Sequence, residues 1–337
     1  DPTSLCNLQC IGCWAAHYGN AHSLSFQTMD SIIAQGKELG THFYIFSGGE
    51  PLLRKHDIIA LCEKHQDCYF LSFTNGTLVD DQLCLDISRV GNLSLAFSIE
   101  GNETATDMRR GTGTYHKVVQ AMQLMHAHRQ LYGYSTCYHR YNTDSVGSDE
   151  FVDEMIDNGC RFAWNFTYIP VGNDASADML ATAQQRSYMY RRIREIRNTK
   201  PIFALDFWND GEFTNGCIGA GRSYLHINSA GEVEPCAFIH YSNVNIHDSS
   251  LLDALRSPLF AAYRKSQPFN QNHLQPCPLL DNPTCLQMMV KTSNARSTEI
   301  ESPEDVEHLC AKTTKAAQQW APVARRLWGR DTHVQVK

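Results

Sequence analysis

The chain has 337 residues, and its 42% apolar content is enough for a large hydrophobic core, which excludes a mainly disordered protein. Its 29 Lys and Arg against 36 Asp and Glu give a formal net charge of −7, without a basic run. We expect no nucleic-acid partner, because sequence-independent binding needs a basic face. No apolar stretch approaches the roughly 20 residues of a membrane helix, and no signal segment stands at the start, so we expect a cytoplasmic protein without a transmembrane segment.

Helices and strands alternate along the first 200 residues. Apolar residues at helical spacing over Ser25–Gly40 precede the apolar run His42–Phe46, which ends in the glycine-rich loop Ser47–Pro51. Further strands are predicted at Cys68–Thr74, Asn92–Ile99, Gly133–Arg140 and Arg161–Ile169. Further helices are predicted near His56–His65, Asp80–Val90, Tyr115–His128, Asp149–Asn158 and Ala181–Arg197.

This alternation predicts βα units on a parallel sheet. With a first strand assumed at Thr3–Leu5, six units end near residue 197, and we expect an α/β fold with a partial (β/α)6 TIM-like barrel. The chemistry of such a barrel lies at the carboxyl ends of its strands.

The pattern changes after Pro201. Beyond an extended segment at Ile202–Phe207, the runs Tyr224–Asn228 and Val233–Phe238 face each other across a short turn, which predicts a hairpin. The chain beyond Cys285 is mostly helical and polar. We therefore expect a barrel at 1–200, a smaller domain at 201–290 and a C-terminal helical extension at 291–337.

The chain contains 13 cysteines, an odd number that favours metal or redox chemistry over a disulfide framework in a protein of this length. Cys6, Cys10 and Cys13 fall within eight residues. Three thiolates on one loop can bind three irons of a 4Fe-4S cluster and leave the fourth iron open for a substrate or cofactor. A structural zinc site is the alternative, although such sites usually have four protein ligands.

The spacing Cys-x3-Cys-x2-Cys resembles that of the radical S-adenosylmethionine (radical SAM) enzymes, and the resemblance covers about residues 1–240. Ser47–Pro51 is similar to the family's GGE loop, and Ser98–Gly101 lies where the family contacts the ribose and amino acid of its cofactor. Arg109–Tyr115 resembles the family's Arg-Gly-x-Gly-Thr/Ser-Tyr/Phe stretch. The combination is much more specific than each short motif. It implies a 4Fe-4S cluster, S-adenosylmethionine and a flavodoxin- or ferredoxin-type reductant.

The resemblance also implies roles for individual residues. The expected cofactor-binding residues are Gly48, Gly49, Glu50, Asn75, Ser98, Glu100 and Arg110, with Arg109 as an alternative to Arg110. Taken singly, the glycines could form only a tight turn, and the charged residues could be ordinary surface groups. Gly12 departs from the family, which has an aromatic residue there beside the adenine, and we expect Trp14 to replace that ring.

A second group of cysteines flanks the predicted hairpin. Cys217-x13-Gly231-x4-Cys236 resembles the SPASM and twitch extensions of radical SAM enzymes, which hold auxiliary clusters. A full SPASM domain continues with Cys-x2-Cys-x5-Cys-x3-Cys, whereas this chain has only Cys277-x7-Cys285. We therefore expect one twitch-like auxiliary 4Fe-4S cluster bound by these four cysteines. Alternative ligands are Cys310, His240 and His273.

Cys137 lies near the end of a strand and either packs in the core or donates a hydrogen atom to a substrate radical, as a catalytic residue. Other candidates for the cavity are Tyr138, Trp164, Tyr168, Asp206 and His240. The remaining thiols, Cys62, Cys68, Cys84 and Cys160, are expected in the core.

The resemblance implies an enzyme that reductively cleaves S-adenosylmethionine and abstracts a hydrogen from a substrate carbon. We favour a peptide or protein side chain as the substrate. A dehydrogenase or carbon–carbon bond-forming enzyme acting on a small molecule or lipid is the alternative, and a non-catalytic iron–sulfur electron-transfer protein is a more remote one. Fold and cofactor do not choose among them.

Overall fold

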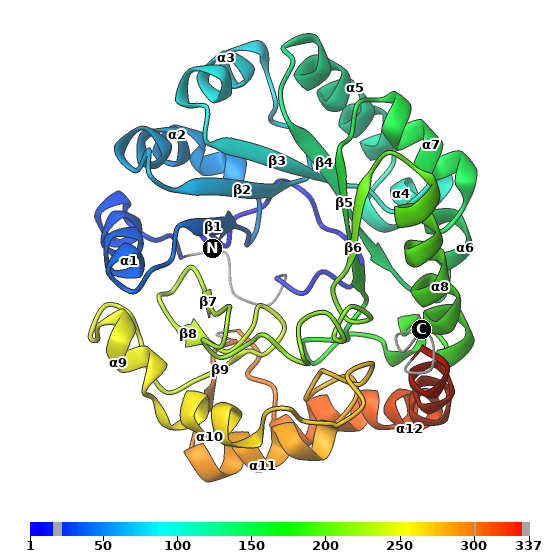
Figure 1. The fold of residues 1–337 in the computed structure, drawn as a ribbon. Helices are drawn as coiled ribbons and strands as arrows, with labels where there is room; N and C mark the ends of the chain where they lie inside the picture. The colour runs from blue at the N-terminus through cyan, green and yellow to red at the C-terminus, as the bar shows by residue number, and fades with distance from the viewer. Residues whose placement is uncertain (16–21, 300, 332–337) are drawn as a thin grey trace.

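The computed structural model describes residues 1–15, 22–299 and 301–331 of the chain. Six parallel strands pair in chain order, each with the next, and form one curled sheet (Figure 1). They are β1 Phe43–Phe46, β2 Tyr69–Thr74, β3 Leu93–Ser98, β4 Tyr132–Tyr138, β5 Phe162–Thr167 and β6 Phe203–Asp206. This arrangement confirms the predicted α/β fold with a partial barrel.

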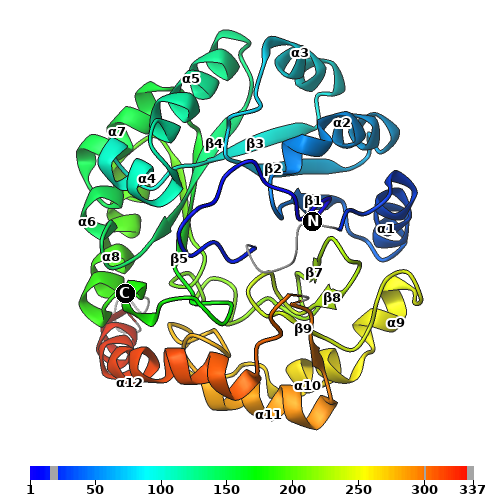
Figure 2. The ribbon, with the colours of Figure 1, turned by 180° about the vertical axis from the view of Figure 1, so that it is seen from behind.

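Helices cover the outside of the curled sheet (Figures 1 and 2). They are α1 Phe26–Glu38, α2 Lys55–Lys64, α3 Asp81–Val90, α4 Glu103–Arg110, α5 Thr114–Ala127, α6 Thr143–Val146, α7 Asp149–Asp157 and α8 Ala183–Thr199, with short 3-10 turns η1 Pro51–Arg54 and η2 Ala177–Met179. Within the described chain, no helix combines the length and the apolar character needed to cross a membrane.

Local sequence explains where several helices begin and end. The Asp80 side chain accepts a hydrogen bond from the Leu83 N–H at 2.8 Å and caps α3, and Gly91 ends that helix in the left-handed conformation with φ 73°. Thr182 and Gln185 form a reciprocal capping box at the start of α8. These caps satisfy backbone groups that the helix itself leaves unpaired.

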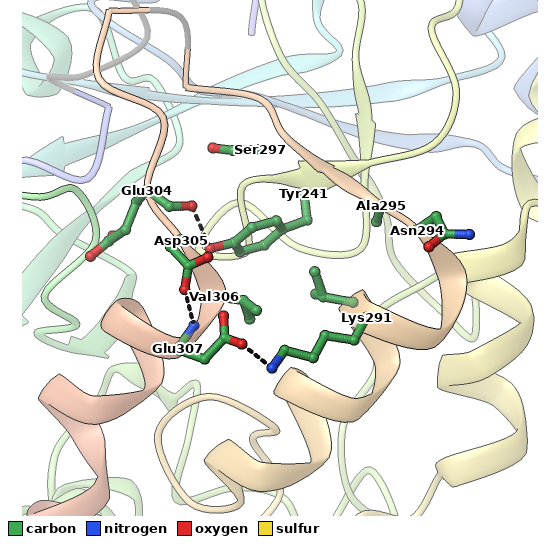
Figure 3. Close-up of a pocket in the computed structure, with 10 residues that line it drawn as sticks. Tyr241, Lys291, Asn294, Ala295, Ser297, Glu304, Asp305, Val306 and Glu307 are labelled. Atoms are coloured by element: carbon green, nitrogen blue, oxygen red, sulfur yellow. Dashed lines mark hydrogen bonds and ion pairs between the residues drawn. The ribbon is translucent and has the colours of Figure 1, made fainter.

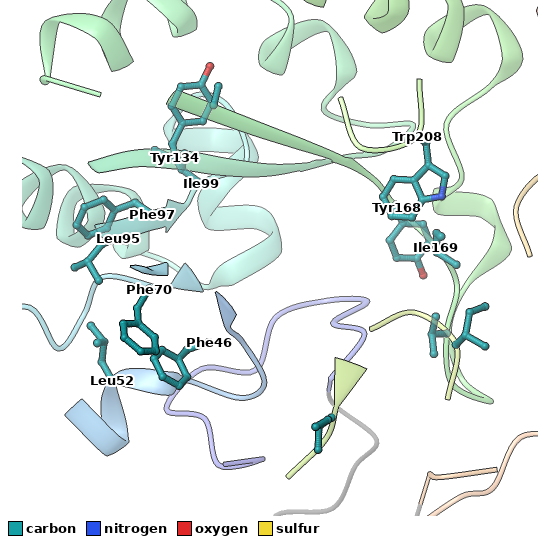
Figure 4. Close-up of a cluster of buried hydrophobic side chains, with 14 of the residues drawn as sticks. Phe46, Leu52, Phe70, Leu95, Phe97, Ile99, Tyr134, Tyr168, Ile169 and Trp208 are labelled. Carbon is teal, nitrogen blue, oxygen red and sulfur yellow. The ribbon is translucent and has the colours of Figure 1, made fainter. Parts of the chain in front are cut away.

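Stacked aromatic rings fill the layer between the sheet and its helices. Phe46 on β1 stacks on Phe70 of β2 with 5.6 Å between ring centroids, and Phe97 of β3 meets Tyr132 of β4 edge-to-face at 5.7 Å. Figure 4 shows Phe46, Phe70 and Phe97 along neighbouring strands. Because side chains alternate along a strand, the intervening residues face the inside of the barrel.

The prediction of a first sheet strand at Thr3–Leu5 is wrong. Thr3 forms only an isolated bridge with Ser23, and the segment bonds to the glycine-rich loop instead. The Glu50 N–H donates to the Leu5 carbonyl at 2.8 Å, beyond the end of β1. The backbone groups of this short segment are therefore used by the loop and by residues 22–24, not by a strand of the sheet.

The sixth strand of the sheet is β6, within the extended segment Ile202–Phe207 that the sequence analysis assigned to the second domain. Phe203 pairs with Phe162, and Asp206 pairs with Asn165, both in parallel register. The sheet thus continues a few residues past the expected boundary at residue 200.

The C-terminal part lies across the open side of the curled sheet (Figure 1). It contains β7 His226–Ile227, β8 Val233–Glu234, β9 Tyr241–Ser242, α9 Leu251–Leu255, α10 Pro258–Ser266, α11 Pro283–Ser293, β10 Arg296–Ser297 and α12 Val306–Asp331. Strands β7 and β8 pair antiparallel, which confirms the predicted hairpin.

Candidate active site

The loop that carries Cys6, Cys10 and Cys13 is fastened to the carboxyl ends of the strands. Besides the bond from Glu50 to Leu5, the Ile11 N–H donates to the Arg109 carbonyl at 2.8 Å. The Arg109 guanidinium in turn donates to the Ile11 carbonyl at 3.2 Å. In Figure 2 this dark blue segment crosses the middle of the curled sheet. The three thiols are therefore held where parallel α/β barrels place their chemistry.

Hydrogen-bond donors surround these thiols. The Leu8 N–H lies 3.5 Å from Cys6 Sγ, the Arg110 guanidinium lies 3.9 Å from Cys10 Sγ, and the Ala15 N–H donates to Cys13. Such donors stabilise the thiolates that bind iron.

The spacing of the thiols also bears on the metal. Among the described residues, no three cysteine sulfurs all lie within 4.8 Å of one another. A tetrahedral zinc site with Zn–S bonds of about 2.3 Å would bring its sulfurs to roughly 3.8 Å. Burial raises the pKa of Cys6 to about 11, so iron must displace its proton on binding. As arranged here, the three sulfurs are spaced more widely than the ligands of a single zinc ion.

Glu50 is almost completely buried beside this loop. Its carboxylate accepts hydrogen bonds from the Leu52 N–H at 3.0 Å, the Thr74 hydroxyl at 2.8 Å and the Asn75 N–H at 2.8 Å. Burial raises the pKa of Glu50, and these three donors act in the opposite direction. Glu50 is thus fixed at the end of β1 and oriented by the loop after β2.

The neighbours of Glu50 hold the thiol loop. A β-carbon on Gly49 would lie 2.0 Å from the Leu5 carbonyl oxygen, so only glycine lets the loop pass this closely. The Asn75 side chain donates to the Asn7 side chain at 2.8 Å and lies 4.0 Å from Cys6 Sγ. Both residues, predicted to bind the cofactor, therefore also position the first thiol.

Glu100 is fully buried between two arginines. The guanidinium groups of Arg109 and Arg110 each approach its Oε1 atom at 2.5 Å, and the Cys137 N–H donates to Oε2 at 3.0 Å. Burial alone would raise the pKa of Glu100, but the two guanidinium groups hold it below its usual range. Glu100 is therefore a carboxylate at neutral pH, and its bonds to Arg110 place that guanidinium beside Cys10. Ser98 lies next to it, with its hydroxyl 3.3 Å from that of Ser135.

The expected role of Trp14 beside the adenine stays a prediction. Trp14 points toward the C-terminal part, where its ring contacts those of His226, Phe238 and His240 at centroid distances of 5.7, 5.7 and 6.2 Å. The ring that lies against Gly12 belongs to Tyr168, which follows β5. No short motif in the sequence links these two positions.

The inner face of β4 and β5 is lined by Cys137 and aromatic rings. Cys137 pairs in register with Phe166, and Phe166 stacks on Trp164 at 5.9 Å. Phe73 of β2 meets Trp164 edge-to-face at 5.4 Å. Burial raises the pKa of Cys137 to about 11. The interior below the thiol loop is therefore apolar and holds a neutral thiol.

Two predicted cavity residues face the other side of the sheet. The Tyr138 hydroxyl accepts from the Thr167 hydroxyl at 2.5 Å and from the Asn209 side chain at 3.1 Å, and it lies near Arg186 of α8. Asp206 accepts from the same Asn209 side chain at 2.7 Å. Strand alternation puts Tyr138 and Asp206 on the helix side, away from Cys137.

The second group of thiols is also surrounded by donors. The Gly219 N–H lies 3.4 Å from Cys217 Sγ, and the Leu280 N–H lies 3.3 Å from Cys277 Sγ. Further donors are the Phe238 N–H to Cys236, the Gln267 side chain to Cys217 and the Trp208 side chain to Cys277. The two side-chain donors were missed, because nothing in the sequence near them marks a thiol partner.

Three of the four predicted auxiliary ligands come together. Burial raises the pKa of Cys236 well above its usual range, and the charges of Cys217 and Cys277 add to the shift. For Cys285, in the first turn of α11, burial alone raises the pKa. The charges of Cys217, Cys236 and Cys277 thus affect one another, and we call these three thiols one electrostatic group. Cys285 is not part of it.

The proposed alternative ligands have other environments. His240 lies 3.3 Å from Glu299 and 3.0 Å from the Ala237 carbonyl oxygen. His273 packs on the Trp328 ring, and Cys310 is buried in α12.

Two surface cavities lie away from both thiol groups. A cavity of about 500 Å³ between α11 and the start of α12 is lined by Tyr241 and by an ion pair of Lys291 with Glu307 (Figure 3). The other, of about 670 Å³, is lined by residues of α4, α6 and α7, including Met108, and by Tyr141 in the loop before α6. Neither cavity is lined by a cysteine.

Comparison with protein families agrees with the two thiol groups. The model of the radical SAM superfamily matches residues 1–146, and the model of the SPASM iron–sulfur cluster-binding domain matches residues 217–279. The first match contains Cys6, Cys10 and Cys13, and the second contains Cys217, Cys236 and Cys277.

Several curated proteins are similar to this chain. An AdoMet-dependent heme synthase of Oleidesulfovibrio alaskensis is 23% identical over 304 residues, which cover 80% of this chain and 77% of the relative. A PqqA peptide cyclase of Streptomyces rochei is 25% identical over 260 residues, which cover 73% of this chain and 69% of the relative.

Solved structures share the fold. Streptococcus suis SuiB bound to precursor peptide SuiA has a TM-score of 0.67 at 16% identity, covering 90% of this chain and 74% of SuiB. The enzyme anSMEcpe with bound AdoMet and a Cp18Cys peptide has a TM-score of 0.62 at 16% identity, covering 98% of this chain and 97% of that chain. The chain belongs to the radical SAM superfamily and carries a SPASM-type iron–sulfur cluster-binding domain, two families whose cofactors are S-adenosylmethionine and 4Fe-4S clusters.

Proposed function

We propose that this protein cleaves S-adenosylmethionine at the Cys6, Cys10 and Cys13 loop and modifies a side chain of a peptide or protein. The observation that carries the cleavage is the convergence of these thiols with Glu50 and Arg110 at the carboxyl ends of the strands. The same thiols are the proposed ligands of the first cluster. Cys217, Cys236 and Cys277, with Cys285 as the fourth predicted ligand, are proposed for the auxiliary cluster.

A 4Fe-4S cluster held by Cys6, Cys10 and Cys13 would supply the electron for reductive cleavage of S-adenosylmethionine and hence the radical chemistry that removes a hydrogen atom from the substrate. The residues of the chain bind and orient. The Glu50 carboxylate, fixed by three donors, suits the ammonium of the methionine moiety. Arg110, held by Glu100, suits its carboxylate.

The interior of the barrel suits a radical reaction because its aromatic rings exclude water. Cys137 lies among these rings as a neutral thiol and is proposed as a hydrogen-atom donor to a substrate radical. A flavodoxin- or ferredoxin-type protein is the proposed source of the electron.

A peptide substrate is supported by the relatives. The Streptomyces rochei protein is named a PqqA peptide cyclase, and SuiB and anSMEcpe were both solved with peptides. The similarity to an AdoMet-dependent heme synthase over 80% of this chain favours a second candidate, a tetrapyrrole substrate.

The first experiment is anaerobic reconstitution of the chain, with 5′-deoxyadenosine measured after addition of dithionite and S-adenosylmethionine. Release that disappears in a Cys6/Cys10/Cys13→Ala variant supports the cleavage, and absence of release from a fully loaded protein contradicts it. Candidate peptides encoded beside the gene are then incubated with the enzyme and analysed by mass spectrometry. Iron-coproporphyrin is tested in parallel, and its conversion without any peptide modification would favour the second candidate.

A further inference from the structure

The end of helix α10 is bonded to the loop that carries Cys217, one of the three grouped thiols. Just beyond its end, the Gln267 side chain donates to the carbonyl oxygens of Cys217 and Gly219 at 3.2 and 3.3 Å. These bonds hold the end of α10 over the loop that follows the first thiol of the group.

Tyr263 lies on α10, one turn before Gln267, and its side chain is 1% exposed. Its ring packs edge-to-face against Phe269 with 5.4 Å between centroids, which fixes the direction of the ring. Among the described residues, its hydroxyl has no hydrogen-bond partner. A buried hydroxyl without a partner is unfavourable, and this one calls for an explanation.

The unpartnered hydroxyl lies near the grouped thiols and near Cys310. Burial raises the pKa of Tyr263 well above its usual range, and the charges of Cys217, Cys236, Cys277 and Cys310 add to the shift. The hydroxyl is therefore within electrostatic reach of all three grouped thiols. A neutral phenol so placed can donate a hydrogen bond to sulfur.

We propose that the Tyr263 hydroxyl donates a hydrogen bond to a sulfur atom of the auxiliary 4Fe-4S cluster and raises its reduction potential. The inference rests on the proposed ligands Cys217, Cys236 and Cys277. The added electron makes the cluster sulfurs more negative, so a donor stabilises the reduced cluster more than the oxidised one. Tyr263 is in this sense a positioning and tuning residue, because it touches the cluster and not the substrate.

The test is Tyr263→Phe in the full chain, reconstituted with iron and sulfide and titrated anaerobically with detection by electron paramagnetic resonance. We expect the auxiliary cluster to shift to a more negative potential, while the potential of the other cluster and the iron content stay unchanged. Resonance Raman of the wild type in D₂O should show a shift of Fe–S stretching bands that is lost in the variant.

Tyr132→Phe is the matched control, because it removes a buried hydroxyl that donates to the Asn158 carbonyl in the barrel, away from both thiol groups. It should leave both potentials unchanged. An unchanged auxiliary potential in a fully loaded Tyr263→Phe variant overturns the hydrogen bond while leaving the ligands intact. Loss of iron in that variant, with a melting temperature like that of the wild type, also overturns it, because the hydroxyl would then be needed to retain the cluster and not to tune it. A wild type without a second cluster overturns the ligand assignment itself.

Discussion

The ring of Tyr168 fills the space in front of Gly12, where an added β-carbon would lie 2.7 Å from the Cε2 atom of the tyrosine. Gly12 also has φ +65°, a conformation that costs a residue with a side chain about 1–3 kcal/mol. The Tyr168 ring can therefore pack beside the loop of Cys13 only because residue 12 has no side chain.

We expect Gly12→Ala to lower the melting temperature of the reconstituted protein, because both the clash and the backbone conformation oppose it. Tyr168→Ala added to Gly12→Ala should recover part of the lost melting temperature, since it removes the clash but leaves the unfavourable backbone conformation of residue 12. Thermal unfolding of the four proteins of this double-mutant cycle measures the coupling. Strictly additive shifts would show that the ring and the glycine do not interact.

Glu100→Gln is expected to destabilise the protein by about 3–5 kcal/mol, because it leaves two buried guanidinium groups without a negative partner. The carboxylate has a lowered pKa in the folded state, so its stabilisation is complete above its ordinary pKa of 4.5 and is lost as pH falls through the folded value. Melting curves recorded from neutral to acidic pH should therefore show that the melting temperatures of the wild type and the variant converge at low pH. A constant difference would contradict this role.

Arg110 and Arg109 should fail in different ways when each is changed to Lys. Arg110→Lys removes the planar guanidinium that bonds to Glu100 and lies beside Cys10. We expect S-adenosylmethionine binding to weaken by about 10- to 100-fold while iron is retained. Arg109→Lys loses the bond to the Ile11 carbonyl, so we expect iron loss instead. Equilibrium binding and iron counts on both variants separate the two roles, and identical behaviour would refute the division.

Asp206 is buried, and its burial, together with the charge of Asp210, raises its pKa to about 6. The ionisation of Asp206 therefore lowers the free energy of unfolding as pH rises from 4 to 6, by about 3 kcal/mol in total. Asp206→Asn should gain stability relative to the wild type across this range. Urea unfolding at pH 4 and pH 7 measures the change, with the exposed Asp174→Asn as the control expected to show none.

Iron content tests the auxiliary ligands. Two 4Fe-4S clusters give about eight irons per chain, and Cys236→Ala should reduce this to about four. Cys285→Ala should retain more iron, because only Cys217, Cys236 and Cys277 form one electrostatic group. Equal losses would place Cys285 among the ligands after all.

The strand and helix order could be predicted because hydrophobic periodicity is local, and five of the six sheet strands lie within or close to the predicted ranges. Thr3–Leu5 failed because its extended backbone found partners in a loop, which periodicity does not reveal. The thiols at Cys6–Cys13 were visible from spacing alone. The contacts of Tyr168 and Tyr263 were not, because they join residues that only tertiary packing brings together.

Trp14 follows Cys13 directly, and Phe238 lies two residues after Cys236, so the contact of these two rings joins the loops of both thiol groups. Iron that orders one loop also restrains the ring that the other loop packs against. We therefore expect that loading of the first proposed cluster site makes loading of the second easier. Iron uptake during reconstitution would then be cooperative, and Trp14→Ala would convert it into two independent steps.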